Sequence, residues 1–170
     1  MSLRDYHREL VPLLQKQNMA NDTINIREYV PSDKEAVLKL IRLNTPQYFA
    51  EEEEVDLSNY LDNYREYYYV LLSGIEIIGC GGINMVDNGT RGKLCWGMIH
   101  PDWQGRSLGS LLLKHRINVL NSMGVKLITV RTSQVVYQFY QKRGFVLKSI
   151  KKDYWAKGLD MYAMEYTVNS

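Results

Sequence analysis

The sequence predicts an α+β domain with a mixed central sheet. Strand and helix patterns follow one another in the order β-α-α-β-β-β-α-β-α-β-β, which corresponds to about six to seven strands and about four helices. The length of 170 residues and the apolar content of 45% fit a single domain with one core. We find no internal repeat and no long linker, so we expect one domain.

The first elements are a strand and a helix. Residues 1–22 are polar and mixed, and we interpret them as an N-terminal extension to a domain that covers 23–170. Ile24–Val30 begins with alternating apolar and polar residues, which is typical of a strand. Ser32 followed by Glu35 matches the S-x-x-E capping box, so we expect a helix to begin at Ser32.

The middle of the chain is expected to form a helix and then strands. Residues 46–64 hold a loop and a second helix, and two strands follow around a turn at Ser73 and Gly74. The second of these strands contains three glycines, which predict a bulge or a close backbone approach: Gly79, Gly81 and Gly82.

The remaining elements alternate between strands and helices. The apolar helix that ends at Gly124 is expected to be largely buried, because its apolar residues exceed a single stripe. The predicted strands cover 93–100, 125–132, 145–155 and 160–168, and the predicted helices cover 108–124 and 133–144.

Charge and composition exclude several classes of function. A net charge of +2 is too small for a nucleic-acid-binding surface, and no apolar run reaches the length of a membrane span. The chain lacks the apolar core of a secretory signal, so we expect a cytoplasmic protein. Cys80 and Cys95 have no neighbouring ligands in sequence, so we expect buried free thiols and no metal site.

The segment H-P-D-W-Q-G-R-S-L-G contains the features of an anion-binding turn. Pro101 lacks an N–H group and ends the strand before it. Gln104–Gly109 then leads directly into a helix, whose first amides have no partner inside the helix and lie at the positive end of its dipole. A glycine there lets a ligand approach those amides, which favours phosphate binding. The segment matches neither a Walker loop nor a dinucleotide fingerprint.

Two motifs carry a resemblance to a known family. Gln104-Gly105-Arg106-Ser107-Leu108-Gly109 follows the pattern [QR]-x-x-G-x-[GA], with a serine in place of the middle glycine. About 35 residues later, Phe139-Tyr140-Gln141-Lys142-Arg143-Gly144-Phe145 follows the pattern [FL]-Y-x-x-x-G-F. Together they resemble the GNAT superfamily of N-acetyltransferases, over about residues 24–168.

The resemblance implies a sheet that splays apart in the middle and binds acetyl-CoA as co-substrate. The amides of the first motif would hold the pyrophosphate, with Arg106 beside it, and the strand end before Pro101 would pair with the pantetheine arm. A backbone N–H of Met98 or Ile99 would polarise the thioester carbonyl. The implied cofactor-binding residues are Met98, Ile99, His100, Gln104, Gly105, Arg106, Ser107, Leu108, Gly109, Ser110 and Gln134.

The resemblance also implies a catalytic acid. Tyr140 would protonate the leaving thiolate, and the alternative is a core tyrosine that packs on the sheet without reacting. The general base stays open among Glu76, His100 and a carboxylate of 51–54, although His100 is better explained as structural. The same acidic run is either a negative rim that attracts an amine or a solvated face. Asp153, Tyr154 and Trp155 would lie at the opposite wall of the acceptor site, where the aromatic residues either contact the acceptor or serve only in packing.

The predicted activity is transfer of an acetyl group from acetyl-CoA to a primary amine, by direct attack in a ternary complex. The acceptor would be a small molecule or a peptide, with no nucleic acid or membrane as partner, and the family resemblance implies a homodimer. The alternative is a GNAT-like module that binds CoA without turnover, or a protein-interaction domain without a cofactor.

Overall fold

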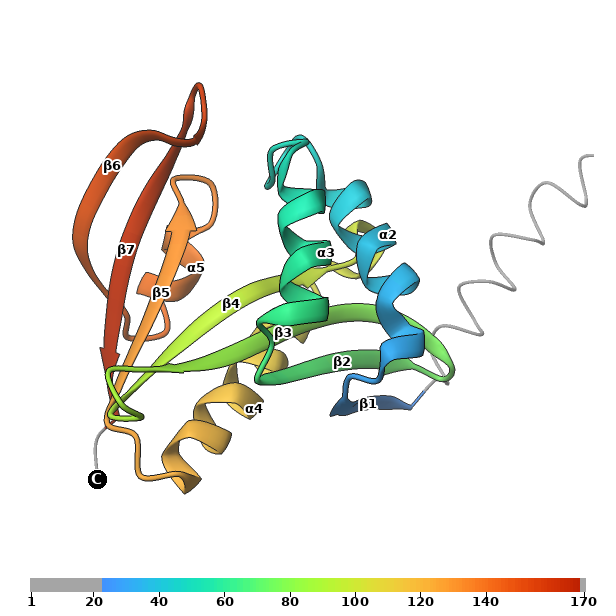
Figure 1. Ribbon diagram of the computed structural model, residues 1–170, viewed down its shortest axis with the longest axis horizontal. Helices are drawn as coiled ribbons and strands as arrows, with labels where there is room; N and C mark the ends of the chain where they lie inside the picture. The colour runs from blue at the N-terminus through green and yellow to red at the C-terminus, as the bar shows by residue number, and fades with distance from the viewer. Residues whose placement is uncertain (1–22, 169–170) are drawn as a thin grey trace, which may run out of the picture.

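The computed structural model describes residues 23–168, and the expected N-terminal extension lies outside them. In this part of the chain seven strands form one sheet in the order β1-β2-β3-β4-β5-β7-β6, in which β4 and β5 run parallel and the other neighbouring strands run antiparallel (Figure 1). The strands are β1 (Ile24–Glu28), β2 (Tyr67–Ser73), β3 (Glu76–Val86), β4 (Arg91–Ile99), β5 (Leu127–Ser133), β6 (Val146–Ala156) and β7 (Leu159–Thr167). The predicted α+β class and mixed sheet are therefore confirmed.

Within residues 23–168, four α-helices accompany the sheet, in the predicted places. They are α2 (Lys34–Asn44), α3 (Glu53–Asn63), α4 (Leu108–Ser122) and α5 (Tyr137–Gln141), and two short 3-10 helices, η1 (Pro31–Asp33) and η2 (Pro101–Trp103), precede α2 and α4. In the part of the chain that the structure describes, no helix is long and apolar enough to cross a membrane.

The helices divide between the two faces of the sheet (Figure 1). On one face, α2 and α3 bury residues such as Ile41 and Leu57 against β2 and β3. On the other face, α4 and α5 share a core with β4 and β5, to which Leu112, Leu120 and Tyr140 contribute. Burial of large apolar side chains on both faces explains why strands such as β2 are apolar almost throughout.

The predicted capping box is wrong. Ser32 lies inside η1, and α2 begins only at Lys34. The local cap is Asp33, whose Oδ2 accepts a hydrogen bond of 2.9 Å from the N–H of Val30. Arg27 on β1 holds both oxygens of Asp33, at 2.7 and 2.9 Å. These bonds from Arg27, together with the N–H of Val30, lower the pKa of Asp33 despite its burial.

The middle of the sheet is splayed, as predicted. β4 and β5 pair only from Arg91 with Leu127 to Leu94 with Val130. Beyond that point the two strands diverge, and Figure 1 shows β4 and β5 meeting at one end and separating towards the other. The opening between them is the setting of the candidate site.

Candidate active site

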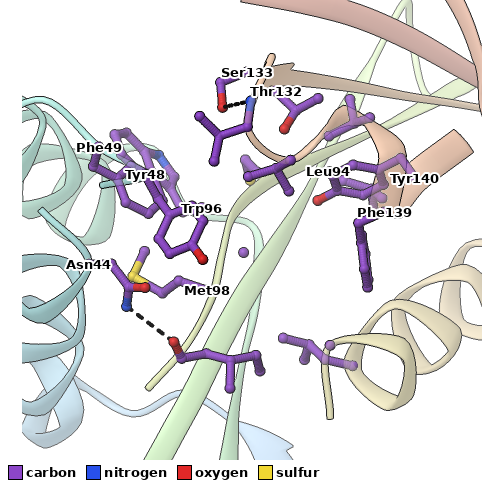
Figure 2. Close-up of a pocket in the computed structure, with 18 of the residues that line it drawn as sticks. Asn44, Tyr48, Phe49, Leu94, Trp96, Met98, Thr132, Ser133, Phe139 and Tyr140 are labelled. Carbon is purple, nitrogen blue, oxygen red and sulfur yellow. Dashed lines mark hydrogen bonds between the residues drawn. The ribbon is translucent and has the colours of Figure 1, made fainter. Parts of the chain in front are cut away.

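A cleft of about 700 Å³ occupies the opening between β4 and β5. Its lining joins the far half of β4, the start of α4, the end of β5 and the start of α5 (Figure 2). Nine of the twelve residues predicted for the site line it: Met98, Ile99, Gln104, Gly105, Ser107, Leu108, Gly109, Ser110 and Tyr140. The structure thus brings together two motifs that lie about 35 residues apart in sequence.

A bulge in β4 explains why the strands separate. The pairing with β3 passes from Gly82 with Cys95 directly to Cys80 with Met98, so Trp96 and Gly97 together face the single residue Gly81. Trp96 has a φ of +49°, which is rare for an aromatic residue. Such a bulge bends its strand and increases the local twist. The bulge begins just past Leu94, where the pairing of β4 with β5 ends.

The start of α4 presents a run of free backbone amides. The first helical hydrogen bond runs from the N–H of Leu111 to the oxygen of Ser107, at 3.1 Å. Among the described residues, no acceptor reaches the N–H groups of residues 105–110. The amide of Gln104 is different, because it donates to Pro101 at 3.3 Å. The anion-binding turn therefore begins one residue later than predicted.

Ser107 occupies a left-handed position. It is the N-cap of α4, with φ +61° and ψ +13°, and its side chain makes no capping hydrogen bond. In this region a residue with a Cβ is strained by about 1–2 kcal/mol. The family motif has a glycine at this position, and a glycine adopts a left-handed conformation without strain. The serine of this chain adopts it at a cost in free energy of folding.

The side chain of Gln104 connects the end of β4 to α2. Its Nε2 donates to Oδ1 of Asn44 and to the oxygen of Ile99, both at 3.0 Å. Asn44 is buried and donates to the same oxygen at 3.1 Å, a bond drawn in Figure 2. The sequence analysis did not identify Asn44 as a residue of the cleft.

A cation does lie beside the first turn of α4, but it is Arg143 and not Arg106. The guanidinium of Arg106 stacks on Trp103, 4.8 Å from the ring centroid, and does not line the cleft. Arg143, from the second motif, donates through Nε to the hydroxyl of Ser110 at 2.9 Å. Arg143 occupies one of the unspecified x positions of that motif, so the motif does not predict this contact.

Two other predicted cofactor residues lie outside the cleft. The N–H of His100 donates to Ile78 at 2.7 Å, and its carbonyl accepts from Trp103 at 2.9 Å, so its backbone is already paired. Gln134 uses its side-chain amide to hold the β6–β7 hairpin, at Gly158 (2.6 Å) and Asp160 (2.8 Å). We therefore remove His100 and Gln134 from the candidate site. Glu76 and His100 border a separate hollow beside α2, so neither fits the role of base.

Tyr140 lines the cleft and is otherwise buried. Its ring is packed edge to face against Phe139 and Phe145, with centroids 5.1 and 5.3 Å away. Figure 2 shows the side chain extending towards β4, near Leu94. Its hydroxyl has no hydrogen-bond partner within the described residues. The ring is therefore fixed by packing, while the hydroxyl is available to a molecule in the cleft.

The opposite half of the cleft has aromatic walls. Tyr154 and Trp155 of β6 line one side, as predicted, and Phe49 stacks on Trp96 at 6.4 Å on the other. The glutamates of the acidic run at 51–54 do not share one role. Glu53 lines the cleft and is buried at the start of α3, whereas Glu54 pairs with Arg42 at 2.7 Å.

Glu53 is held in place by the chain before it. Its Oε2 accepts a hydrogen bond of 2.7 Å from the N–H of Ala50, and its other oxygen has no partner in the described part of the chain. Burial raises the pKa of Glu53 above its ordinary value, and the bond from Ala50 opposes this rise. A carboxylate with a raised pKa is suited to accept a proton near neutral pH.

A buried arginine lies under the bulge. Arg116 of α4 is 2% exposed, and its guanidinium fills the space left by Gly81 and Gly97, where an added Cβ would come within 3.0 Å of it. Its one hydrogen bond in the described residues is long, 3.4 Å to the oxygen of Gly82, and Nε has no partner. The glycines signalled a close approach, but the sequence did not show which side chain makes it.

The two cysteines are free thiols, as predicted. Cys95 lines the cleft and lies 3.2 Å from the hydroxyl of Tyr60. Burial raises the pKa of the Cys95 thiol, and raises that of Cys80 to about 12. Neither thiol is therefore a thiolate near neutral pH. Within residues 23–168, no group of three or more His, Cys, Asp or Glu side chains could hold a metal ion.

Known proteins share both this sequence pattern and this fold. The family model for the acetyltransferase (GNAT) family matches residues 35–145. An amino-acid acetyltransferase from Mannheimia succiniciproducens is 28% identical over 101 residues, which cover 59% of this chain and 21% of that protein. The chain thus spans about a fifth of the length of this curated relative.

Solved structures agree in fold. A putative GNAT acetyltransferase from Desulfovibrio desulfuricans superposes with a TM-score of 0.76 at 18% identity, and the match covers 86% of this chain and 100% of the other. The PaiA N-acetyltransferase from Thermoplasma acidophilum, solved in complex with coenzyme A, gives a TM-score of 0.68 at 16% identity, with coverage of 86% and 99%.

Proposed function

Since the chain belongs to the GNAT acetyltransferase family, we propose that it transfers an acetyl group from acetyl-CoA to a primary amine. One observation carries the proposal. Gly105 and Ser107–Ser110, whose amides have no acceptor in the described residues, line the same splayed cleft as Tyr140, whose hydroxyl has no partner there either. This arrangement offers an anion site and a proton donor in one cleft, which suits acyl transfer from a thioester.

The anion site suits the pyrophosphate of CoA. Six amides without acceptors lie at the positive end of the dipole of α4, and Arg143 adds a fixed charge beside Ser110. The pantetheine arm would then run along the free edge of β4 at Met98 and Ile99, as an added strand does. Asn44 and Gln104 already hold the carbonyl of Ile99, and so they fix that edge.

The reaction proposed is a direct attack. The nitrogen of a neutral amine adds to the carbonyl carbon of the thioester, the C–S bond breaks, and the amide forms. Tyr140 gives its hydroxyl proton to the leaving sulfur and regains a proton from solvent or from the amine that has reacted. Because burial raises the pKa of Cys95, the thiol in the cleft is a poor nucleophile, which favours direct transfer over an acyl-enzyme.

Glu53 is our candidate for the base. A lysine-type amine, with a pKa of about 10.4, is almost wholly protonated at neutral pH, and must lose a proton before it attacks. Among the described residues, Glu53 is the carboxylate that lines the cleft, and it has one oxygen without a partner. Its raised pKa brings it closer to the neutral range, where a base is most effective.

The test measures binding and turnover separately. Acetyl-CoA and CoA are expected to raise the melting temperature of the full chain, and acetyl-CoA with a panel of primary amines is expected to release free thiol. Stabilisation without thiol release from any amine would favour a non-catalytic CoA-binding module. Absence of stabilisation by both compounds would contradict CoA binding and favour an interaction domain.

The role of Ser107 can be resolved with two variants. Ser107→Gly removes both the strain and the hydroxyl, whereas Ser107→Ala removes only the hydroxyl and serves as the matched control. We expect the glycine variant to be more stable than the alanine variant by about 1 kcal/mol in urea unfolding. If the hydroxyl binds a phosphate oxygen, both variants lose acetyl-CoA affinity by calorimetry; equal affinity in all three proteins would show that it contributes nothing.

The remaining expectations stay predictions. These are the cytoplasmic location, the homodimer and the boundary between an extension at 1–22 and a domain at 23–170.

A further inference from the structure

The charges in the cleft are unbalanced. Its lining contains one carboxylate, that of Glu53, and four basic side chains, those of Lys93, Arg116, Arg131 and Arg143. The cleft therefore does not present the negative rim, which was one of the two alternatives for residues 51–54. Arg143 lies at the proposed phosphate site and Arg116 is buried beneath the bulge, so Lys93 and Arg131 are the cations left for another ligand.

Lys93 and Arg131 lie on the same face of neighbouring strands. Their neighbours Leu94 and Val130 are buried in the core that α4 covers, and side chains alternate along a strand. Both cations therefore point to the other face, between α3 and the β6–β7 hairpin. Lys93 pairs in register with Thr129, two residues before Arg131, which places the two Cα atoms about 8 Å apart from the usual strand spacing and rise.

The acids near these cations are already engaged. Glu165, which pairs with Thr129 across β5 and β7, lies 3.5 Å from Lys148. Glu66 accepts hydrogen bonds from Asn84 and from the N–H of Met85, both at 3.1 Å. In the described residues Lys93 has no ion pair, and Arg131 makes one long bond of 3.5 Å, to the hydroxyl of Tyr154. Two adjacent cations thus face the cleft, and neither is in an ion pair within the described residues.

The phosphates of CoA would lie too far from Lys93 and Arg131 to pair with these two cations. The anion-binding turn follows the end of β4, whereas Lys93 lies six residues before Ile99, about 20 Å back along the strand. Arg131 follows Val130, the last residue of β5 in register with β4, and so lies near Lys93 and away from the turn. An anion bound by Lys93 and Arg131 therefore has to belong to the acceptor.

We propose that the acceptor is a small primary amine that also carries a carboxylate, of the amino-acid type. This inference rests on the proposed function and narrows its substrate class. The carboxylate binds between Lys93 and Arg131, where a guanidinium offers paired donors. The amine then lies towards Glu53 and the stacked rings of Phe49 and Trp96. Aromatic rings and a carboxylate both attract an ammonium group, which the amine carries before it loses its proton. Polyamines, which carry only positive charge, do not fit this lining.

A matched panel tests the class of acceptor. Each standard amino acid is compared with its α-amide and with the amine that lacks the carboxyl group, and spermidine represents the polyamines. Thiol release from acetyl-CoA gives kcat/KM for each. We expect at least one amino acid to react 10- to 100-fold faster than its amide, the loss typical of a removed charged hydrogen bond. Spermidine reacting faster than every amino acid, or no amino acid reacting at all, would overturn the inference.

Variants test the residues. Arg131→Gln is expected to raise KM for the preferred amino acid 10- to 100-fold and to change kcat/KM for its amide less than twofold, whereas Arg131→Lys keeps most of the preference. Lys114→Gln removes a positive charge from the exposed side of α4 and is the control for net charge. An equal loss for the acid and the amide would refute the carboxylate site. Melting shifts with acetyl-CoA, and thiol release from other amines, report the proposed function independently.

Discussion

Replacing Tyr140 with phenylalanine is expected to lower kcat by about 10²- to 10⁴-fold, the usual contribution of a general acid. Acetyl-CoA affinity should stay within about twofold of the parent, because the variant keeps the ring that packs between Phe139 and Phe145. The hydroxyl makes no hydrogen bond within the described residues, so its removal breaks no contact of the folded protein. Steady-state thiol release and calorimetry with acetyl-CoA provide the two measurements.

Tyr137→Phe is the matched control for this experiment. Tyr137 lies on the same short helix but packs against Tyr162, with ring centroids 4.7 Å apart, and does not line the cleft. Its variant should keep the parent kcat. If Tyr140→Phe also keeps the parent kcat, then Tyr140 is only a core residue, and another group or water protonates the sulfur.

The elements of this fold are predictable because their patterns are local. Alternation at Ile24–Val30 and the apolar surface of the helix that starts at Leu108 each depend on neighbours a few residues apart. The capping box failed for the opposite reason. The motif S-x-x-E was present, but Arg27 on β1 makes a two-point ion pair with Asp33, and that contact fixes where the helix begins.

The residues of the candidate site likewise fall into those that a short local motif predicts and those that only distant contacts explain. The turn before α4 and the position of Tyr140 follow from short motifs, and both lie in the cleft. Asn44 and Arg116 lie outside both motifs, and Arg143 stands at an unspecified position of the second one. Their roles arise from partners 33 to 60 residues away in sequence. The positive charge of the cleft likewise depends on tertiary structure, because the register of β4 with β5 places Lys93 and Arg131 on the same face of the sheet.

Arg116→Met is expected to raise the free energy of unfolding by about 1–3 kcal/mol. A buried cation carries a desolvation cost that only close, well-directed partners offset, and hydrophobic replacements of similar volume are often stabilising. Here the guanidinium has one long bond of 3.4 Å, to Gly82, and a buried Nε without a partner in the described residues. For a chain of this size each kcal/mol corresponds to about 2–4 °C in melting temperature.

Arg116→Ala separates charge from volume. It removes the same charge but leaves a cavity beside Gly81 and Gly97, where the guanidinium now fills the space. We therefore expect the alanine variant to be less stable than the methionine variant by about 2–4 kcal/mol. Urea titrations with an unchanged m-value give both numbers. A methionine variant less stable than the parent would mean that the guanidinium, lying across the peptide groups of the bulge, stabilises the splayed strand by more than its burial costs.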